Sequence, residues 1–266
     1  MIARPQPRPQ FFYTTAALPC PYVQGRIERK VITELEGPEA PFLHDRLSRA
    51  GFRRSHNIAY APVCPGCRAC IPIRVRAADF TPDRTLRRVA RDNADIAVYE
   101  ADPRASPAQF QLFQRYQLAR HGDGDMAEMS FYDFRAMIED TPIESFVAEF
   151  RTPDDRLVAG CLIDRLDDGF SAVYSFFEPE MAHRSLGSLA ILWLIGQARA
   201  AGLPYVYLGY WVAESRKMSY KSRFRPADIF SAGQWRPLGA RDLAPPAQFP
   251  PSSQGHPLDA EHVRAR

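Results

Sequence analysis

The sequence predicts an α+β protein whose C-terminal half is built on a three-stranded antiparallel meander, an apolar helix and one further strand. Three alternating apolar runs, ESFVAEF, LVAGCLIDRL and GFSAVYSFFEP, are joined by the turns TPDD and DDG and indicate the meander. An apolar stretch from Ser185 to Ala201, ended by Gly202, indicates the helix. LPYVYLGYW then has the apolar character of a buried strand. Elements in this order favour helices packed on a sheet.

Length and composition indicate a globular protein of one large domain or two small ones. The chain has 266 residues, 45% of them hydrophobic, and a formal net charge of +3. It contains no apolar run of about 18 residues, so we predict no membrane span. The first ten residues, MIARPQPRPQ, lack the apolar stretch of a signal peptide. We therefore expect a cytoplasmic protein.

The first part of the chain mixes short strands with one helix. Residues 1–10 are proline-rich and polar and are predicted to be disordered. RKVITEL alternates as a strand does, and Pro41 to Phe52 carries apolar residues at helical spacing, with Gly51 where a C-cap belongs. NIAYAPVC and IPIRVRA are strand candidates on either side of a cysteine cluster. We predict a small cysteine-containing α+β domain over residues 11–103.

The second part, residues 104–239, is predicted to be the larger domain. It opens with a helix from Pro107 to His121 and a second from about Ser130 to Asp140, where Ser130 and Asp133 form a capping-box pattern. After the meander, the apolar helix and the buried strand, we expect a short basic helix and a final strand, ADIFSAGQWRPL. Residues 240–266 are predicted to be a disordered tail.

Basic residues are clustered although the net charge is small. Arg84 to Arg91 carries four arginines and Arg216 to Arg225 five basic residues, both without an acid. A third cluster lies between Arg46 and Arg54. Local basic patches on a near-neutral protein suggest a polyanionic partner. The alternative for any one patch is the solvated face of a surface helix.

Three of the five cysteines form a C-x-x-C-x-x-C pattern: Cys64, Cys67 and Cys70. With Cys20 as a fourth ligand they would satisfy a tetrahedral zinc site or an iron–sulfur cluster. The alternative is a set of reduced cysteines that pack in a small core, and clustered cysteines in the cytoplasm do not favour disulfides. Cys161 lies in an alternating strand and is predicted to be a core residue.

The segment after the third meander strand predicts an anion site. A helix N-terminus near Ser185 to Gly187 offers free backbone N–H groups and the positive end of the helix dipole, and Arg184 adds a charge. The order of elements matches the core of the N-acetyltransferase (GNAT) fold, and Arg184 to Gly187 resembles the start of its pyrophosphate loop. Leu189 stands where that loop has a small residue. This departure argues against a coenzyme A site and leaves room for a different activated acyl donor with a phosphate-rich part. An aminoacyl-tRNA, an activated ester on a polyanion, is such a donor.

The stretch YLGYWVAESRKMSYKSRFRP supports a nucleic acid as the donor. Its basic side chains can face phosphates: Lys217, Lys221, Arg223 and Arg225. Tyr210, Trp211 and Tyr220 are candidates for stacking on a base or ribose. The alternative for the strand aromatics is ordinary core packing.

Taken together, five segments resemble the arginyl-tRNA–protein transferase family, in its bacterial aspartate/glutamate leucyltransferase branch. They span about residues 11–238, in the family's order: CPYVQGRIERK, YAPVCPGCRACIPIRV, YQLARHGDGDM, VYSFFEPEMAHRSLG and YLGYWVAESRKMSYKSRFRP. The resemblance implies a GNAT-like catalytic domain without coenzyme A. It implies transfer of leucine from Leu-tRNA to the N-terminal Asp or Glu of acceptor proteins, which creates a degradation signal. No cofactor is required for that reaction, and we expect a monomer.

Residue roles follow from this chemistry. The acceptor carboxylate needs a cation, for which Arg74, Arg76, Lys217 and Arg223 are candidates. Glu178 and Glu214 are the candidates for a general base that deprotonates the acceptor ammonium.

Three other functions stay open at this point. Arginyl transfer would need a buried carboxylate for the guanidinium, whereas a leucyl pocket needs apolar walls such as Phe176, Phe177, Leu186 and Trp193. A coenzyme A-dependent acetyltransferase and a non-catalytic RNA- or zinc-binding protein are the other two.

Overall fold

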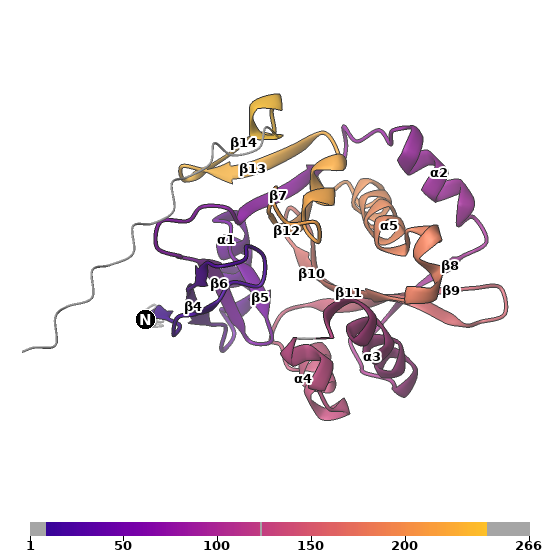
Figure 1. Cartoon of the computed structure of the whole chain (residues 1–266), viewed down its shortest axis with the longest axis horizontal. Helices are drawn as coiled ribbons and strands as arrows, with labels where there is room; N and C mark the ends of the chain where they lie inside the picture. Colours follow the sequence, from indigo (N-terminus) through magenta and orange to yellow (C-terminus); the bar gives the residue numbers. More distant parts are fainter. Residues whose placement is uncertain (1–8, 123, 244–266) are drawn as a thin grey trace, which may run out of the picture.

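The computed structural model describes residues 9–122 and 124–243 and shows a mixed α/β molecule built on one large sheet (Figure 1). Eight strands form that sheet, in the order β14-β13-β7-β12-β11-β10-β9-β8. Their bounds are β7 (Ile71–Arg76), β8 (Ala97–Ala101), β9 (Ser145–Arg151), β10 (Leu157–Leu166), β11 (Gly169–Phe177), β12 (Tyr205–Trp211), β13 (Ala227–Ser231) and β14 (Gln234–Pro237).

The remaining strands belong to the N-terminal part of the chain. A four-stranded sheet has the order β1-β4-β6-β5, and β2 pairs with β3 alone. Their bounds are β1 (Tyr13–Thr14), β2 (Leu18–Pro19), β3 (Ile27–Glu28), β4 (Lys30–Glu34), β5 (Arg53–Ser55) and β6 (Ile58–Pro62).

Four of the α-helices lie where hydrophobic spacing and caps predict them, whereas the helix over residues 84–92 was not predicted. The five α-helices of the described residues are α1 (Ala40–Arg49), α2 (Arg84–Asp92), α3 (Pro107–His121), α4 (Phe131–Glu139) and α5 (Leu186–Ala200). The predicted capping box of α4 is confirmed, because Ser130 and Asp133 bond each other's backbone N–H. Gly51, with φ of +86°, follows α1 as predicted. No helix in residues 9–122 or 124–243 is long and apolar enough to cross a membrane.

Two predicted elements differ from the structure. The expected single final strand is a hairpin, β13–β14, because Ala232 and Gly233 both have positive φ, as a tight hairpin turn requires. The expected short basic helix is a single 3-10 turn, η3 (Ser219–Arg223). Three further 3-10 turns are η1 (Asp125–Glu128), η2 (Pro179–Arg184) and η4 (Ala240–Leu243). Turn η4 occupies the start of the predicted disordered tail, while residues 1–8 and 244–266 lie outside the described residues.

Strand alternation divides the large sheet into two buried faces. One face packs against α2 and α5 and holds Phe146, Cys161, Ile163 and Val206. The opposite face packs against α3 and α4 and holds Val147 and other residues that alternate with the first set. Cys161 is thus a core residue, as predicted. The sheet is antiparallel except where β11 runs parallel to β12.

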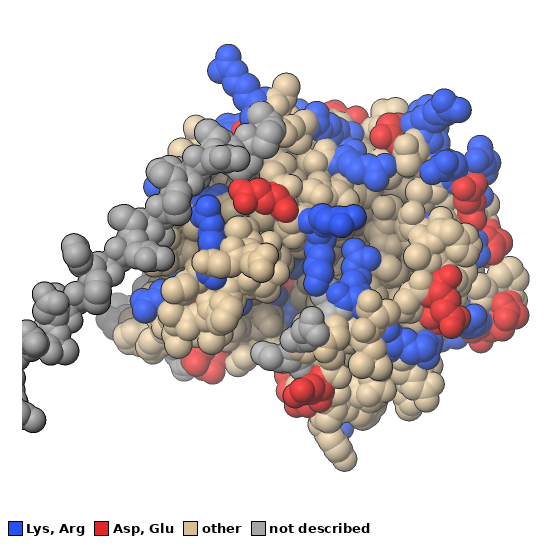
Figure 2. Space-filling view, viewed as in Figure 1, with Lys and Arg blue, Asp and Glu red and all other residues tan. Residues whose placement is uncertain are grey.

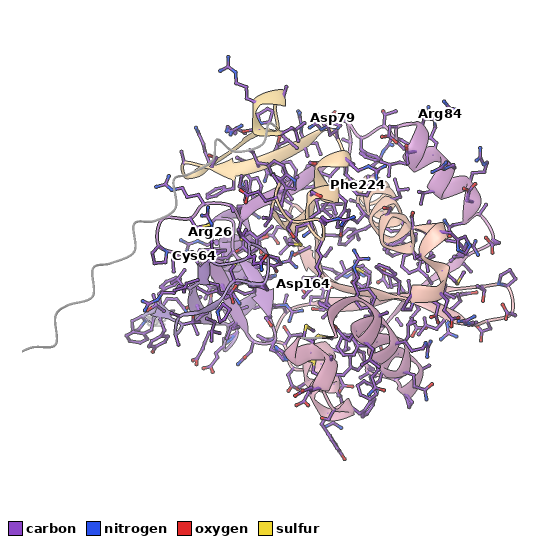
Figure 3. All side chains as sticks on the ribbon, in the orientation of Figure 1. Arg26, Cys64, Asp79, Arg84, Asp164 and Phe224 are labelled. Atoms are coloured by element: carbon purple, nitrogen blue, oxygen red, sulfur yellow. The ribbon has the colours of Figure 1, made fainter. Side chains whose placement is uncertain are left out.

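The N-terminal part is joined to the large sheet by a shared strand and by side-chain contacts. Strand β7, which precedes the predicted boundary at residue 103, lies between β12 and β13. In addition, the buried carboxylate of Asp164 on β10 accepts hydrogen bonds from Arg54 of β5 at 2.7 and 2.6 Å and from the Ser145 hydroxyl at 2.7 Å. His44 Nε2, on α1, lies 3.0 Å from the same carboxylate. Asp164 is labelled in Figure 3, where the two parts meet.

Candidate active site

Strands β11 and β12 diverge soon after they begin. They pair in parallel only where Gly169 to Ser171 faces Tyr205 to Tyr207. The guanidinium of Arg53, from β5 of the N-terminal sheet, lies in the opening between them. Its Nη2 donates to the carbonyl oxygens of Ala172 at 2.8 Å and Val173 at 2.7 Å on β11, and its Nη1 donates to Leu208 O at 3.2 Å on β12. Arg53 thus satisfies the carbonyls that the divergence leaves without a strand partner.

Gly209 makes room for this guanidinium. A Cβ built on Gly209 would lie 1.2 Å from Arg53 Nη1, and the φ of Gly209 is +74°. The register between β12 and β7 shifts between Tyr207 and Gly209. A lone glycine inside a strand signals a close approach by another group. That signal was present in LPYVYLGYW, but our sequence analysis did not select Arg53.

Lys221 is the second cation at the divergence. Its side chain is 7% exposed, and Nζ donates to the carbonyl oxygen of Tyr210 at 2.8 Å. Burial lowers the pKa of Lys221 well below its ordinary value, and the neighbouring charge of Arg53 lowers the pKa further. Within the described part of the chain, Lys221 forms no ion pair. The site therefore joins two basic side chains without a carboxylate to balance them.

Tyrosines from both parts of the protein surround these cations. The Tyr210 hydroxyl lies 3.2 Å from Gly51 O and 3.0 Å from Tyr60 O, which fixes β12 against the N-terminal sheet. Burial raises the pKa of Tyr22 to about 12, with a smaller contribution from Tyr60. These hydroxyls stay protonated at neutral pH and can serve as hydrogen-bond donors.

On the other side of the divergence the walls are aromatic. The rings of Tyr116 on α3 and Phe177 on β11 are 4.8 Å apart, and the Arg120 guanidinium lies 5.6 Å from the Phe177 ring. Burial raises the pKa of Tyr220 to about 12; Tyr116 and Cys161 raise it further, whereas Arg120 and Arg53 lower it. The wall suits an apolar group because aromatic rings, those of Tyr116 and Phe177, form it.

The predicted anion loop lies at the end of β11, but its arginine points elsewhere. Ser185 has a left-handed conformation, with φ of +54°, and is exposed at the start of α5. A Cβ on Gly187 would lie 3.0 Å from Phe177 Cε1, so the glycine allows the helix to approach β11 closely. Arg184, however, donates to Asp92 O at 3.0 Å and pairs with Asp95. Its role here is to hold α2 and α5 together.

The two predicted general bases lie in different surroundings. Glu178, at the end of β11, is buried and accepts hydrogen bonds from Arg115 at 3.0 Å and Arg156 at 2.8 Å. Burial alone would raise the pKa of Glu178, but the bonds from Arg156 and Arg115 outweigh it and lower the pKa. A carboxylate held in this way is a weak proton acceptor. Glu214 is exposed in the loop after β12.

Four of the predicted binding residues are already engaged or covered. Tyr210 and Trp211 are buried, so neither ring is free to stack on a base. The Arg74 guanidinium is stacked 3.5 Å from the Tyr205 ring centroid and lies 3.5 Å from Asp228. Arg76 is within 4 Å of two carboxylates, those of Asp79 and Asp228. Strand burial and existing ion pairs therefore argue against these four assignments, which stay predictions.

The other basic candidates are at the surface. Lys217, Arg223 and Arg225 are exposed. Figure 2 shows Lys and Arg side chains gathered near the centre of the viewed face and again on α2. In Figure 1 the β12–η3 region occupies that central position, so the surface around the divergence is basic.

The cysteine cluster links the two sheets, between β6 and β7. Cys67 N donates to Cys64 O at 3.2 Å, and Arg29 N donates to Cys64 Sγ at 3.4 Å; Cys64 is labelled in Figure 3. Burial raises the pKa of Cys70 to about 12, and Cys20, Cys64 and Cys67 raise it further. Over residues 9–122 and 124–243, no group of three or more Cys, His, Asp or Glu side chains is arranged to hold a metal ion. This arrangement does not fit a metal or cluster, whose presence stays a prediction.

Comparisons with known proteins agree with this architecture. The family model described as arginine-tRNA-protein transferase, N terminus, matches residues 18–88, and the corresponding C-terminus model matches residues 108–231. An aspartate/glutamate leucyltransferase of Gluconacetobacter diazotrophicus is 64% identical over 251 residues, which covers 92% of this chain and 96% of that protein. One of Granulibacter bethesdensis is 61% identical over 241 residues, which covers 91% and 90%.

A solved structure also resembles the chain more distantly. The structure of L-PGS from Bacillus licheniformis covers 64% of this chain and 59% of its own chain, with 13% identity and a TM-score of 0.46. That likeness is too weak to assign a fold. The two family models and the highly identical relatives are decisive: the chain belongs to the arginine-tRNA–protein transferase family.

Proposed function

We propose that this protein transfers leucine from leucyl-tRNA to the N-terminal Asp or Glu of acceptor proteins and so marks them for degradation. Its family and the names of its relatives support the reaction. The observation that carries the proposal is the pair of basic side chains at the divergence of β11 and β12, partly buried Arg53 and buried Lys221. A desolvated positive site without an internal counter-ion suits the side-chain carboxylate of an acceptor.

The reaction needs alignment of the substrates more than covalent catalysis. The acceptor α-amine attacks the ester carbonyl carbon, a C–N bond forms, and the C–O bond to the terminal ribose breaks. The proton lost by the amine is finally carried by the departing ribose oxygen, and the vicinal hydroxyl of the same ribose can relay it. Because the ester is already activated, holding both substrates in line supplies most of the rate gain.

In this proposal the leucyl side chain packs against the aromatic wall of Tyr116, Phe177 and Tyr220. Of the apolar walls expected from sequence, Phe176 and Leu186 are core residues, while Phe177 and Trp193 are partly exposed. An arginyl donor would require a carboxylate for its guanidinium, and among the described side chains the charged neighbours beside this wall are Arg120 and Arg53. Like charges repel, so leucine is favoured over arginine.

A GNAT-like catalytic part is the architecture that we propose for this site. The meander β9–β10–β11, helix α5 and the parallel strand β12 follow one another as in that fold, and the diverging strands give the opening for an acyl group. Leu189 packs on the core where the acetyltransferase loop has a small residue, which favours a tRNA donor over coenzyme A.

The test is a transfer assay with labelled Leu-tRNA and four peptides that differ only in the first residue: Asp, Glu, Asn or Ala. We expect label on the Asp and Glu peptides alone, since Asn matches Asp in shape but not in charge. Labelled Arg-tRNA and acetyl-CoA serve as alternative donors in parallel. Transfer from either of these instead of Leu-tRNA, or equal labelling of the Asn peptide, would overturn the proposal.

A further inference from the structure

Helix α2 presents arginines on the side that faces away from the core. Leu86 is buried in the core that α5 shares and Val89 is also buried, whereas the arginines of the helix are exposed. Together they form what we call the arginine stripe: Arg84, Arg87, Arg88 and Arg91. Arg84, Thr85, Arg88 and Arg91 line an open groove of about 370 Å³. Figure 2 shows these charges on α2, and Figure 3 labels Arg84 at the start of the helix.

The stripe disfavours the isolated helix. Arg84 and Arg88 are four residues apart, as are Arg87 and Arg91, and like charges at this spacing repel. The first turn of α2 has no acidic residue, so Arg84 also lies at the positive end of the helix dipole. A surface of this kind is best explained by a negatively charged partner that offsets the repulsion.

Nearby carboxylates do not neutralise the first part of the stripe. Asp83 caps the helix by accepting from Leu86 N at 2.8 Å, and Asp95 pairs with Arg184. Asp92 lies 3.2 Å from Arg91 and forms an ion pair with that one arginine. Among the described residues, no ion pair involves Arg84 or Arg88.

The stripe is continuous with the segments that we assign to the donor. At the C-terminal end of α2, Asn93 Nδ2 donates to Arg184 O at 2.9 Å, next to the start of α5. At the other end, Phe80 stacks on Phe224 with ring centroids 6.5 Å apart, next to the exposed Arg223 of η3. A polyanion whose end reaches the divergence of β11 and β12 can therefore extend over α2.

We propose that the arginine stripe of α2 binds the phosphate backbone of the donor tRNA, away from its aminoacylated end. The inference rests on the proposed function, because it takes leucyl-tRNA as the donor. From Arg84 to Arg91 the stripe spans eight residues of helix, roughly 10 Å, which is long enough to contact successive phosphates of one strand. Such contacts position the RNA and carry no sequence information.

The test compares two double variants that remove the same charge. Arg84→Gln with Arg88→Gln removes two stripe charges and keeps good helix formers. Arg104→Gln with Arg135→Gln removes two exposed arginines outside the stripe, one in the loop after β8 and one on α4, across the sheet from α2. For each protein we would measure the KM for full-length Leu-tRNA, kcat, and the salt dependence of tRNA binding.

For the stripe variant we expect a roughly tenfold higher KM for Leu-tRNA with unchanged kcat. The slope of the logarithm of the tRNA-binding constant against the logarithm of the salt concentration should be smaller in magnitude by about two. The control variant should match the native protein, and a short leucylated acceptor-stem RNA should give equal KM values for both variants. If native protein transfers leucine and the two variants shift alike or not at all, the stripe inference is wrong and the proposed function stands. A higher KM for the acceptor peptide instead would assign the stripe to an acidic protein.

If the native protein transfers no leucine, the proposed function fails. In that case the salt dependence of tRNA binding still tests whether the arginine stripe contacts phosphates, because binding is measured without the reaction.

Discussion

The guanidinium of Arg53 occupies the space that a side chain at Gly209 would need. A Cβ at residue 209 would lie 1.2 Å from Arg53 Nη1, and that same nitrogen donates to Leu208 O at 3.2 Å. A residue of the N-terminal sheet thus enters the strand divergence of the large sheet only because a glycine faces it.

Replacing Gly209 should separate backbone strain from collision with Arg53. Gly209→Ala should lower the free energy of unfolding by about 2–5 kcal/mol, from the positive φ and from overpacking, and should reduce transfer. Gly233→Ala is the matched control, since its φ is +79° and nothing lies within 4 Å of the added Cβ. Thermal unfolding of both variants checks this. Equal losses would mean that strain alone explains the glycine.

Lys221→Met should preserve or raise the stability of the protein while it reduces activity. A buried cation without a counter-ion disfavours folding, so an apolar side chain of similar length should leave the free energy of unfolding unchanged or raise it by about 1–2 kcal/mol. The KM for an Asp-initiated peptide should rise at least tenfold, because the acceptor carboxylate loses its partner. Calorimetry and steady-state kinetics measure the two effects. Parallel losses of stability and activity would assign Lys221 a structural role.

The pH dependence of acceptor binding should report the same lysine. In the free protein, burial holds the pKa of Lys221 below its ordinary value, and an acceptor carboxylate would raise that pKa again. Between the two pKa values, binding takes up a proton, so the Kd for an Asp peptide should rise with pH by up to about tenfold per unit. Below the free pKa it should be flat.

Lys221→Arg supplies the control for this pH dependence, because arginine stays charged. Its Kd for the Asp peptide, measured by titration in the presence of uncharged tRNA, should not vary over the same window. An identical slope in the native protein and in the Lys221→Arg variant would place the titrating group elsewhere.

The Asp164 cluster should make the junction of the two parts sensitive to acid. Burial would raise the pKa of Asp164, but the charge of Arg54 and the bonds from His44 and Arg54 lower it well below its ordinary value. The stabilisation is therefore complete above the unfolded pKa, near 3.9, and is lost as the pH falls toward the folded pKa. Asp164→Asn should cost about 3–5 kcal/mol at pH 7, since it leaves buried Arg54 without its counter-ion.

Denaturant titrations at pH 7 and at about pH 3 would check this, because the difference between native protein and variant should shrink at the lower pH. Asp167→Asn is the control, with a side chain that is 78% exposed. A comparable loss in that variant would contradict a special role for the buried cluster.

Glu178→Gln tests whether this residue acts as the general base. Both arginine partners remain in reach of the amide oxygen, so we expect a loss of about 1–3 kcal/mol in unfolding free energy and an unchanged acidic limb in the kcat–pH profile. Disappearance of that limb would restore Glu178 as the base.

Sequence patterns predicted the periodic elements well, because they depend on local spacing and caps. The helix Pro107–His121, the capping box at Ser130 and the meander are examples. The site was harder to predict, because its key residue approaches from a distant segment. Arg53 lies 155 residues before Leu208 in the chain, and no periodicity relates them. Similarly, exposed and buried positions look alike in RKMSYKSR, where Lys221 is covered and Lys217 is exposed.

The position of β7 has a consequence for how the protein is made. This strand is synthesised early, yet its partners β12 and β13 follow more than a hundred residues later. The large sheet therefore cannot close until nearly the whole chain has left the ribosome, and contacts of such long sequence separation slow folding. A fragment that begins at residue 104 would contain β12 and β13 but lack β7, the strand that lies between them. Adding residues 9–103 as a separate peptide should restore the complete sheet.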